Sequence, residues 1–308
     1  MRFNLLILIL LPVLASSCFT GVESTPKIIY KEEKNSRADS SAEERISSMF
    51  KPDPFSRWES GKAFYVTSPR ISLALSGTSP QTVMPETGDS IVYTGCRTVT
   101  DLTGDEIVEL LFTAPRTGSE LTYRTNSTRR KLDESDKVEI PFTIDLGLVG
   151  LAAGELAGKE YFIKTSLWSD GSGGTVNGRK FIKVKVTGVV PGNEVYPFRV
   201  LFADEAGNPG SVYMSAASGA RWIPREFQSL FSIVDPRLSY PQISDAMWRK
   251  IINSKVEKGM TKTEATLALG SPAGIDRGHD HSSSYERWAY SDGVYLIFED
   301  GLLVRHNQ

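Results

Sequence analysis

Residues 61–68 read GKAFYVTS and residues 158–165 read GKEYFIKT, so the same Gly-Lys pair precedes the same kind of aromatic, β-branched run. A second match follows in the same order, because LLFTA at 110–114 corresponds to VLFAD at 200–204. In both copies a glycine-containing turn comes next. Two anchors in one order predict a tandem duplication of a small β domain. Chance similarity between aromatic strands is the alternative.

The sequence around these two matches is typical of short strands and turns. From Ser60 to about Ser218, short β-branched and aromatic runs are broken by Gly, Pro, Asp and Asn. We expect β domains at 58–135 and 136–224, each shorter than the roughly 100 residues of an immunoglobulin-type sandwich. A small SH3-like or other short barrel is therefore favoured for each, with a divergent immunoglobulin-like sandwich as the alternative. Residues 144–158 are expected to form a short helix or a covering loop.

The C-terminal part of the chain predicts two helices. Residues 225–242 are expected to form a connector, and residues 243–308 a separate domain. The first helix is predicted over 245–254, where apolar residues recur at helical spacing. Thr261 and Glu264 then form a T-x-x-E capping box, in which each side chain accepts a backbone N–H at the start of a second helix.

Three short strands are predicted after these helices and a polar loop. They cover 285–290, 294–298 and 302–306. Asp-Gly stands between them at 292–293 and 300–301, and Asp-Gly is a strong hairpin signal because both central residues of a type I′ turn need positive φ. The sequence therefore predicts an α-α-β-β-β domain after the two β domains.

The motifs of this domain resemble the SmpA/OmlA (BamE-like) family of small outer-membrane lipoproteins. The family's Gly-Met-Thr-Lys-x-Glu helix start and Leu-Gly-x-Pro helix end stand at 259–264 and 269–272. Its Trp-x-Tyr strand and its Phe-x-Asp/Asn-Gly-x-Leu strand stand at 288–290 and 298–303. The resemblance implies the fold of this domain more than its role, because caps, turns and core residues carry it.

The N-terminus predicts export and a lipid anchor. Residues 1–17 read as a signal peptide, whose apolar run at 3–15 is shorter than the 18 or so residues of a membrane span. The string LASSC at 14–18 resembles the lipobox of bacterial lipoproteins, so we expect Cys18 to carry palmitate or a similar lipid. Ordinary signal-peptidase cleavage is the alternative. Phe19 is not the aspartate of an inner-membrane retention signal, which favours the outer membrane, facing the periplasm or the cell surface.

Residues 18–50 are expected to be the lipidated N-terminus and a flexible tether. They are rich in Ser, Glu, Lys and Thr, with only an isolated apolar cluster at 28–30. Such a segment buries too little apolar surface to offset the entropy of ordering it. Residues 40–48 are long enough for a short helix but have no sustained apolar stripe.

Composition argues against several classes of function. The 308 residues include 35 basic and 37 acidic side chains, a balance that argues against a nucleic-acid partner. Two cysteines and three histidines leave little material for metal or cluster sites, and we expect no cofactor. His279 and His281 flank Asp280 like metal ligands, but the surrounding Ser and Gly favour a solvated loop. Cys96 is expected to be a buried structural thiol.

The sequence contains no familiar catalytic motif. Neither G-x-S-x-G nor H-E-x-x-H occurs, so we expect no enzyme activity. Trp168 and Trp222 stand beside a Gly-rich loop and a small-residue stretch, which makes them candidate partner-binding residues, with core packing as the alternative. The sequence predicts a non-catalytic, lipid-anchored envelope protein that binds or assembles other envelope proteins at the outer membrane. The alternative is a surface lipoprotein that binds glycans or other nutrients.

Overall fold

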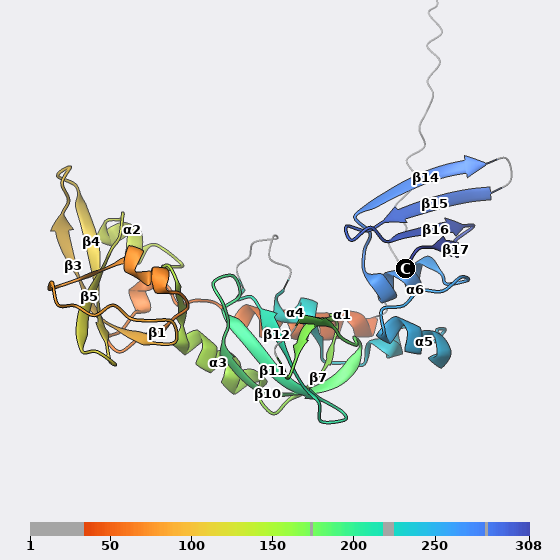
Figure 1. Cartoon of the computed structure of the whole chain (residues 1–308), viewed down its shortest axis with the longest axis horizontal. Coiled ribbons are helices and arrows are strands. Elements are labelled where there is room, and N and C mark those ends of the chain that lie inside the picture. Colours follow the sequence, from red (N-terminus) through yellow and green to blue (C-terminus); the bar gives the residue numbers. More distant parts are fainter. Residues whose placement is uncertain (1–33, 173–174, 218–224, 281–282) are drawn as a thin grey trace, which may run out of the picture. The chain divides into compact units, whose positions relative to one another are not determined.

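The computed structural model describes residues 34–172, 175–217, 225–280 and 283–308, and these residues form mainly antiparallel β-sheet (Figure 1). They build a six-stranded, a seven-stranded and a four-stranded sheet, each with a hydrophobic core cluster. The β-rich α+β class predicted from the sequence is confirmed, and the architecture includes a half-barrel. Among the described residues, no helix is long and apolar enough to cross a bilayer.

The first β domain is a six-stranded sheet in the order β2-β5-β4-β3-β1-β6. Its elements are η1 (Phe55–Arg57), β1 (Ala63–Val66), η2 (Pro69–Leu73), β2 (Leu75–Gly77), β3 (Ser90–Thr100), β4 (Glu106–Ala114), β5 (Ser119–Arg124), α2 (Arg129–Asp133) and β6 (Thr143–Asp145). Because β6 pairs with β1, the first sheet extends past the boundary expected at residue 135.

The second β domain is a seven-stranded sheet in the order β13-β7-β10-β11-β12-β8-β9. Its elements are α3 (Leu146–Leu156), β7 (Glu160–Ile163), β8 (Leu167–Asp170), β9 (Thr175–Asn177), β10 (Ile182–Pro191), β11 (Phe198–Asp204), β12 (Pro209–Met214), α4 (Phe227–Leu230) and β13 (Phe231–Ser232). The helix α3 lies within the segment expected to be helix or covering loop. Its Asp145 N-cap accepts hydrogen bonds from two backbone N–H groups of the first turn.

The two β domains share one topology. Along the chain, each domain has a first strand, a second strand, a three-strand meander, a short helix and a last strand. The last strand pairs with the first. The second strand pairs with the third strand of the meander, at the opposite end of the sheet. The corresponding strands are β1 and β7, β2 and β8, β3 and β10, β4 and β11, β5 and β12, and β6 and β13. Only the short β9 has no counterpart among the described residues. The two sheets therefore have the common strand order that a tandem duplication would produce.

Local hydrogen bonding repeats as well. The Gly-Lys pair at 61–62 exchanges two main-chain hydrogen bonds with Tyr93, and the pair at 158–159 does the same with Val186. Two residues after each of these partners, the strand has a glycine at a register shift. Such bulges bend and twist a strand, which favours a curled sheet. Among the described residues each β domain is one hydrogen-bonded sheet, which favours a barrel over a sandwich of two facing sheets.

The connector is shorter than the expected 225–242, because α4 and β13 belong to the second β domain; it contains η3 (Pro236–Ser239) and leads to the C-terminal domain. This domain consists of α5 (Asp245–Ile252), α6 (Lys262–Leu269), β14 (Gly274–Asp280), β15 (Ser283–Ala289), β16 (Tyr295–Glu299) and β17 (Leu302–His306), with the strands in sequential order. The predicted capping box at the start of α6 is confirmed. The strand β14 is an addition to the predicted order, because its residues were expected to be a polar loop. β14 is an edge strand of its sheet, and a strand whose two faces are both accessible does not need alternating apolar residues. The apolar alternation that predicts a strand is therefore missing from its sequence.

The expectation of a flexible tether up to residue 50 is wrong for its last part. Residues Lys34–Met49 form the helix α1, and Phe50, which follows it, is 1% exposed and lies in the core of the second β domain. Ser47 Oγ accepts a hydrogen bond from Gln228 N, which ties α1 to α4. Ile46 packs against the same core, so Ile46 and Phe50 together attach the C-terminal end of α1 to the second β domain.

Candidate functional site

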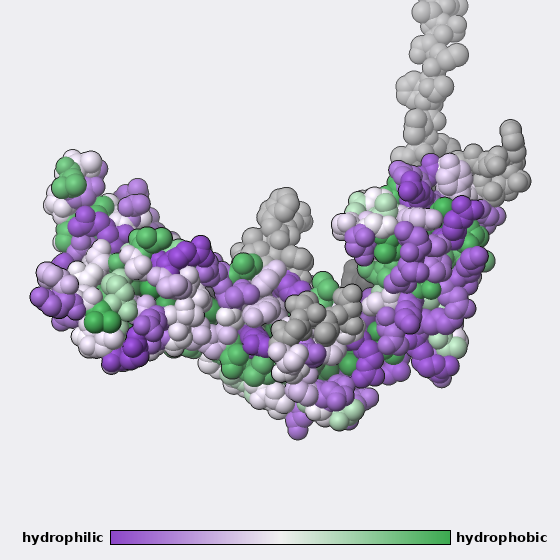
Figure 2. Space-filling view, in the orientation of Figure 1, coloured by the Kyte–Doolittle hydropathy of each residue, from purple (hydrophilic) through white to green (hydrophobic). Residues whose placement is uncertain are grey.

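On the face drawn in Figure 2, hydrophobic residues form small patches among hydrophilic ones. A more concentrated apolar lining occurs in a groove of about 540 Å³, which we call the inter-domain groove. Its walls come from residues 52–64 and 137–148, the turn before β11 and the residues after β12. The apolar residues of the lining include Pro52, Trp58, Phe64, Ile140, Phe142, Ile144, Val195, Pro197 and Ala216.

All three residues of β6 line this groove. The strand β6 is the last in its sheet, with β1 on one side and, among the described residues, no strand on the other. Edge strands have unpaired main-chain groups that can add a further strand. The groove therefore combines an apolar lining with a free strand edge.

The residue before β6 has a strained backbone. Phe142 has a φ of 62°, in the left-handed region that non-glycine residues seldom occupy. Its carbonyl accepts a hydrogen bond from Thr67 N at 2.9 Å, and the Arg70 guanidinium lies 4.9 Å from its ring centroid. These contacts hold a costly conformation at the groove wall, and strained residues of this kind concentrate at functional sites.

An ion-pair cluster at the groove fixes the end of β6, with Lys62 and Asp145 largely buried and Asp53 exposed. The Lys62 ammonium lies 2.6 Å from Asp145 and 2.9 Å from Asp53. Burial alone would lower the pKa of Lys62, but the hydrogen bonds with Asp145 and Asp53 outweigh burial and raise it. Asp145 also caps α3, so one carboxylate joins β6, β1 and the helix that leads to the second β domain.

The turn before β11 forms the other rim of the groove. Asn193 Oδ1 accepts the backbone N–H groups of Val195 and Tyr196, which makes the turn rigid. Glu194 pairs with Arg70 at 2.5 Å, a contact from the second β domain to the first. Val195 is 63% exposed and lines the groove, so an apolar side chain projects at its rim.

One polar atom of the groove wall is unsatisfied. Ser215 is 4% exposed, and its Oγ has no hydrogen-bond partner among the described residues. A buried hydroxyl without a partner is unfavourable. This oxygen is itself buried, so the unsatisfied hydroxyl lies behind the surface of the groove.

The carboxylates around the groove are paired. Glu139 forms an ion pair with Lys137, Glu194 with Arg70, and both aspartates with Lys62. The lining is therefore close to neutral in charge.

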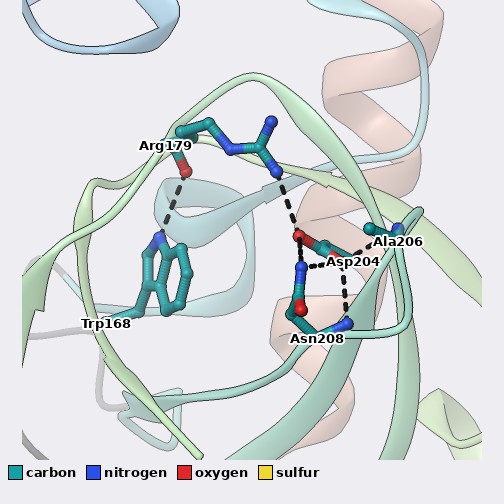
Figure 3. Close-up of polar contacts among 5 residues, drawn as sticks. All are labelled: Trp168, Arg179, Asp204, Ala206 and Asn208. Atoms are coloured by element: carbon teal, nitrogen blue, oxygen red, sulfur yellow. Dashed lines mark hydrogen bonds and ion pairs between the residues drawn. The ribbon is translucent and has the colours of Figure 1, made fainter.

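Trp168, predicted as a partner-binding residue, is half-buried in the second β domain (Figure 3). Its Nε1–H donates to the Arg179 carbonyl at 3.1 Å, and its ring meets Phe202 edge-on at 5.4 Å between centroids. Gly178 lies so close to the indole that a Cβ there would come within 1.9 Å of Cε2. The contacts fix the ring and leave part of it exposed, so a partner-binding role stays a prediction.

A carboxylate network holds the segment against which Trp168 rests. Asp204 pairs with the Arg179 side chain at 3.0 Å and accepts hydrogen bonds from Ala206 and Asn208 (Figure 3). Burial alone would raise the pKa of Asp204, but these hydrogen bonds and the Arg179 charge outweigh burial and lower it. The network closes the β11–β12 turn and fixes Arg179 next to the indole.

The remaining predicted residues lie elsewhere. Cys18, Trp222 and His281 fall outside the described residues, and the backbone of His279 is in β14. Among the described residues, no group of three metal-binding side chains is arranged to hold an ion. Cys96 is half-buried rather than buried, because it stands on β3 where the Arg129 guanidinium, 2.8 Å from Sγ, covers it only in part.

Sequence reasoning missed the residues that build the groove. Phe142 and Ser215 have no local signal, because strain and an unsatisfied hydroxyl exist only in the folded chain. Trp58 and Val195 stand in segments predicted to be strand or turn, and only the fold brings them to one groove.

Comparison with known proteins gave no match to a family, to a curated protein or to a solved structure. The resemblance of the C-terminal motifs to the SmpA/OmlA family therefore stays a prediction.

Proposed function

We propose that this chain is a non-catalytic, lipid-anchored protein of the bacterial outer membrane that binds other envelope proteins, and that the inter-domain groove receives an extended, apolar segment of a partner. The strained Phe142 beside the edge strand β6 is the observation on which the proposal chiefly rests. A segment that enters the groove can pair with the free edge of β6 and place alternate side chains against the apolar lining.

The charges around the groove support binding rather than catalysis. A general acid or base needs a carboxyl or amine whose protonation state can change near neutral pH. Lys62 instead has a raised pKa and stays a charged partner of Asp53 and Asp145. These groups serve to hold β6 and α3 in place.

The proposed location in the cell envelope rests on sequence motifs near the two ends of the chain. The string at 14–18 favours lipidation of Cys18, and the C-terminal motifs favour an SmpA/OmlA-like domain. The helix start with its capping box and the hairpin at 300–301 have the geometry that these motifs predict. The additional strand β14 distinguishes the domain from the expected order.

Site-specific photo-crosslinking tests the groove. A photoreactive amino acid at Val195, at the groove rim, is expected to give a discrete protein adduct in cells. The matched control is Leu102, which is fully exposed in the β3–β4 turn and does not line the groove. Equal adducts at both positions, or none at 195, would contradict the proposal. Saturable glycan binding by the purified chain, lost on Trp168→Ala, would favour the nutrient-binding alternative.

Metabolic labelling tests the anchor. We expect labelled palmitate to enter the wild-type chain and the Cys96→Ala variant but not Cys18→Ala, because only Cys18 stands in the lipobox-like string. The Cys96 variant controls for the loss of a thiol as such. Label in Cys18→Ala, or none in the wild type, would show that the anchor proposal is wrong.

A further inference from the structure

A second cavity, of about 660 Å³, lies where the connector meets the second β domain and the C-terminal domain. Its lining is mixed: the charged residues are Glu43, Lys164, Lys180 and Asp235, and the apolar ones include Phe181, Val234, Pro236 and Leu267. Unlike the inter-domain groove, this cavity has ammonium groups in its wall.

Lys180 is the unusual member of this lining. The residue is only 7% exposed, and no described carboxylate forms an ion pair with its ammonium. The ammonium lies 5.5 Å from the Phe181 ring centroid, the only stabilising contact of that group in the described part of the chain. Burial without a partner lowers the pKa of Lys180 to about 8, so the side chain is still mostly charged at pH 7.

The backbone next to Lys180 is fixed and strained. Phe181 has a φ of 55°, and its ring lies in the core of the C-terminal domain, 5.9 Å from Trp248. Lys180 N donates to Ile252 O at 3.1 Å. The strained Phe181 and the hydrogen bond from Lys180 N to Ile252 O thus fix the backbone of Lys180 against the C-terminal domain.

The other charges of the cavity already have partners. Glu43 accepts Ile233 N at 3.1 Å and lies 3.7 Å from the Lys164 ammonium. Asp235 pairs with Arg237 at 3.2 Å. The charges of Glu43, Lys164 and Asp235 are therefore compensated, and the Lys180 ammonium is the charge in the described wall that has no counter-charge.

We propose that this cavity binds a small organic monocarboxylate, whose carboxylate pairs with the Lys180 ammonium and whose apolar part contacts Phe181, Val234 and Leu267. A single uncompensated charge suits a singly charged ligand. A phosphate dianion would place its second charge near Glu43 and Asp235, which disfavours it. The site is separate from the inter-domain groove and does not depend on it.

Ligand-observed NMR on the full chain tests the site with butyrate as the probe and butyramide as its neutral isostere. We expect saturable butyrate binding at pH 7 that weakens at least tenfold in Lys180→Met and also above pH 9, where the lysine is neutral. The matched control is Lys185→Met, because Lys185 is exposed on β10 and does not line the cavity; it should bind butyrate like the wild type. Butyramide should bind at least tenfold more weakly.

Acylation of lysines provides a second measurement that needs no variant. At pH 8 and constant ionic strength, butyrate is expected to slow the labelling of Lys180, read by mass spectrometry, and to leave Lys185 unchanged. Equal binding of butyrate and butyramide, unchanged affinity in Lys180→Met, or tighter binding of inorganic phosphate than of butyrate would each overturn the proposal.

Discussion

Glu286 is the side chain through which the stability of the C-terminal domain is best tested. It stands on β15 and is 18% exposed. Its carboxylate accepts hydrogen bonds from Trp288 Nε1 and Arg277 Nε and pairs with the Lys262 ammonium, each at 3.0 Å. One carboxylate thus joins the start of α6 to two strands of the sheet.

The magnitude follows from the proton affinity of this carboxyl. Burial alone would raise its pKa, but the hydrogen bonds from Trp288, Lys262 and Arg277 outweigh burial and lower the pKa to about 2. A fall from the ordinary 4.5 to about 2 corresponds to about 3 kcal/mol, at about 1.4 kcal/mol for each pKa unit. Since the folded-state pKa is the lower one, this stabilisation is fully present above pH 4.5 and is lost as the pH falls toward 2.

Glu286→Gln keeps the shape of the side chain and removes its charge. We expect the substitution to lower the free energy of unfolding of the domain by about 2–3 kcal/mol at pH 7, by about half of that at pH 3 and by little at pH 2. Urea unfolding of the full chain, followed by the ¹⁹F NMR line of 5-fluorotryptophan at Trp288, reports on this domain alone. Glu299→Gln is the matched control, because Glu299 is exposed at the end of β16 and should change stability by less than about 0.5 kcal/mol. A loss below about 0.5 kcal/mol in Glu286→Gln, or a loss that is the same at pH 7 and pH 2, would refute the reasoning.

Two further substitutions test the second β domain. Phe50→Ala should lower the free energy of unfolding in urea by about 3–5 kcal/mol, because the ring is 1% exposed in the core. The control Met49→Ala should lower it by less than about 1 kcal/mol, because Met49 is 42% exposed. Equal losses would show that α1 does not dock. Gly178→Ala should shift the ¹⁹F line of Trp168, since its Cβ would lie 1.9 Å from the indole Cε2. Gly154→Ala, which meets nothing within 4 Å in α3, should leave that line unchanged and add about 0.5–1 kcal/mol of stability.

The features predicted best from the sequence are those whose causes are local. The capping box needs only Thr261 and Glu264, and both bonds of the box form. Asp300 and Gly301 have φ values of 47° and 88°, as a type I′ turn requires. At the other Asp-Gly only Gly293 has positive φ, because Tyr290 N bonds to Val294 O and so closes a longer loop.

The features that were missed depend on contacts between distant parts of the chain. The helix α1 has few apolar residues and docks because Ser47 and Phe50 meet elements some 150 or more residues away. Lys180 stands in a charged, strand-like segment that resembles a surface, and its burial comes from Ile252 and the connector. Periodicity and propensity do not contain this information.

The comparison of the two β domains bears directly on the groove. The strands β6 and β13 occupy the same place at the edge of the two sheets. The helix α1 is hydrogen-bonded on both sides of β13 along the chain, because Ser47 accepts a hydrogen bond from Gln228 N in α4 and Glu43 accepts one from Ile233 N just after β13. The inter-domain groove, with its strained Phe142, lies at β6. The same edge position thus occurs in both β domains. A segment of the chain itself is bound next to β13, and a groove lies next to β6, which fits our proposal that a segment of another protein binds there.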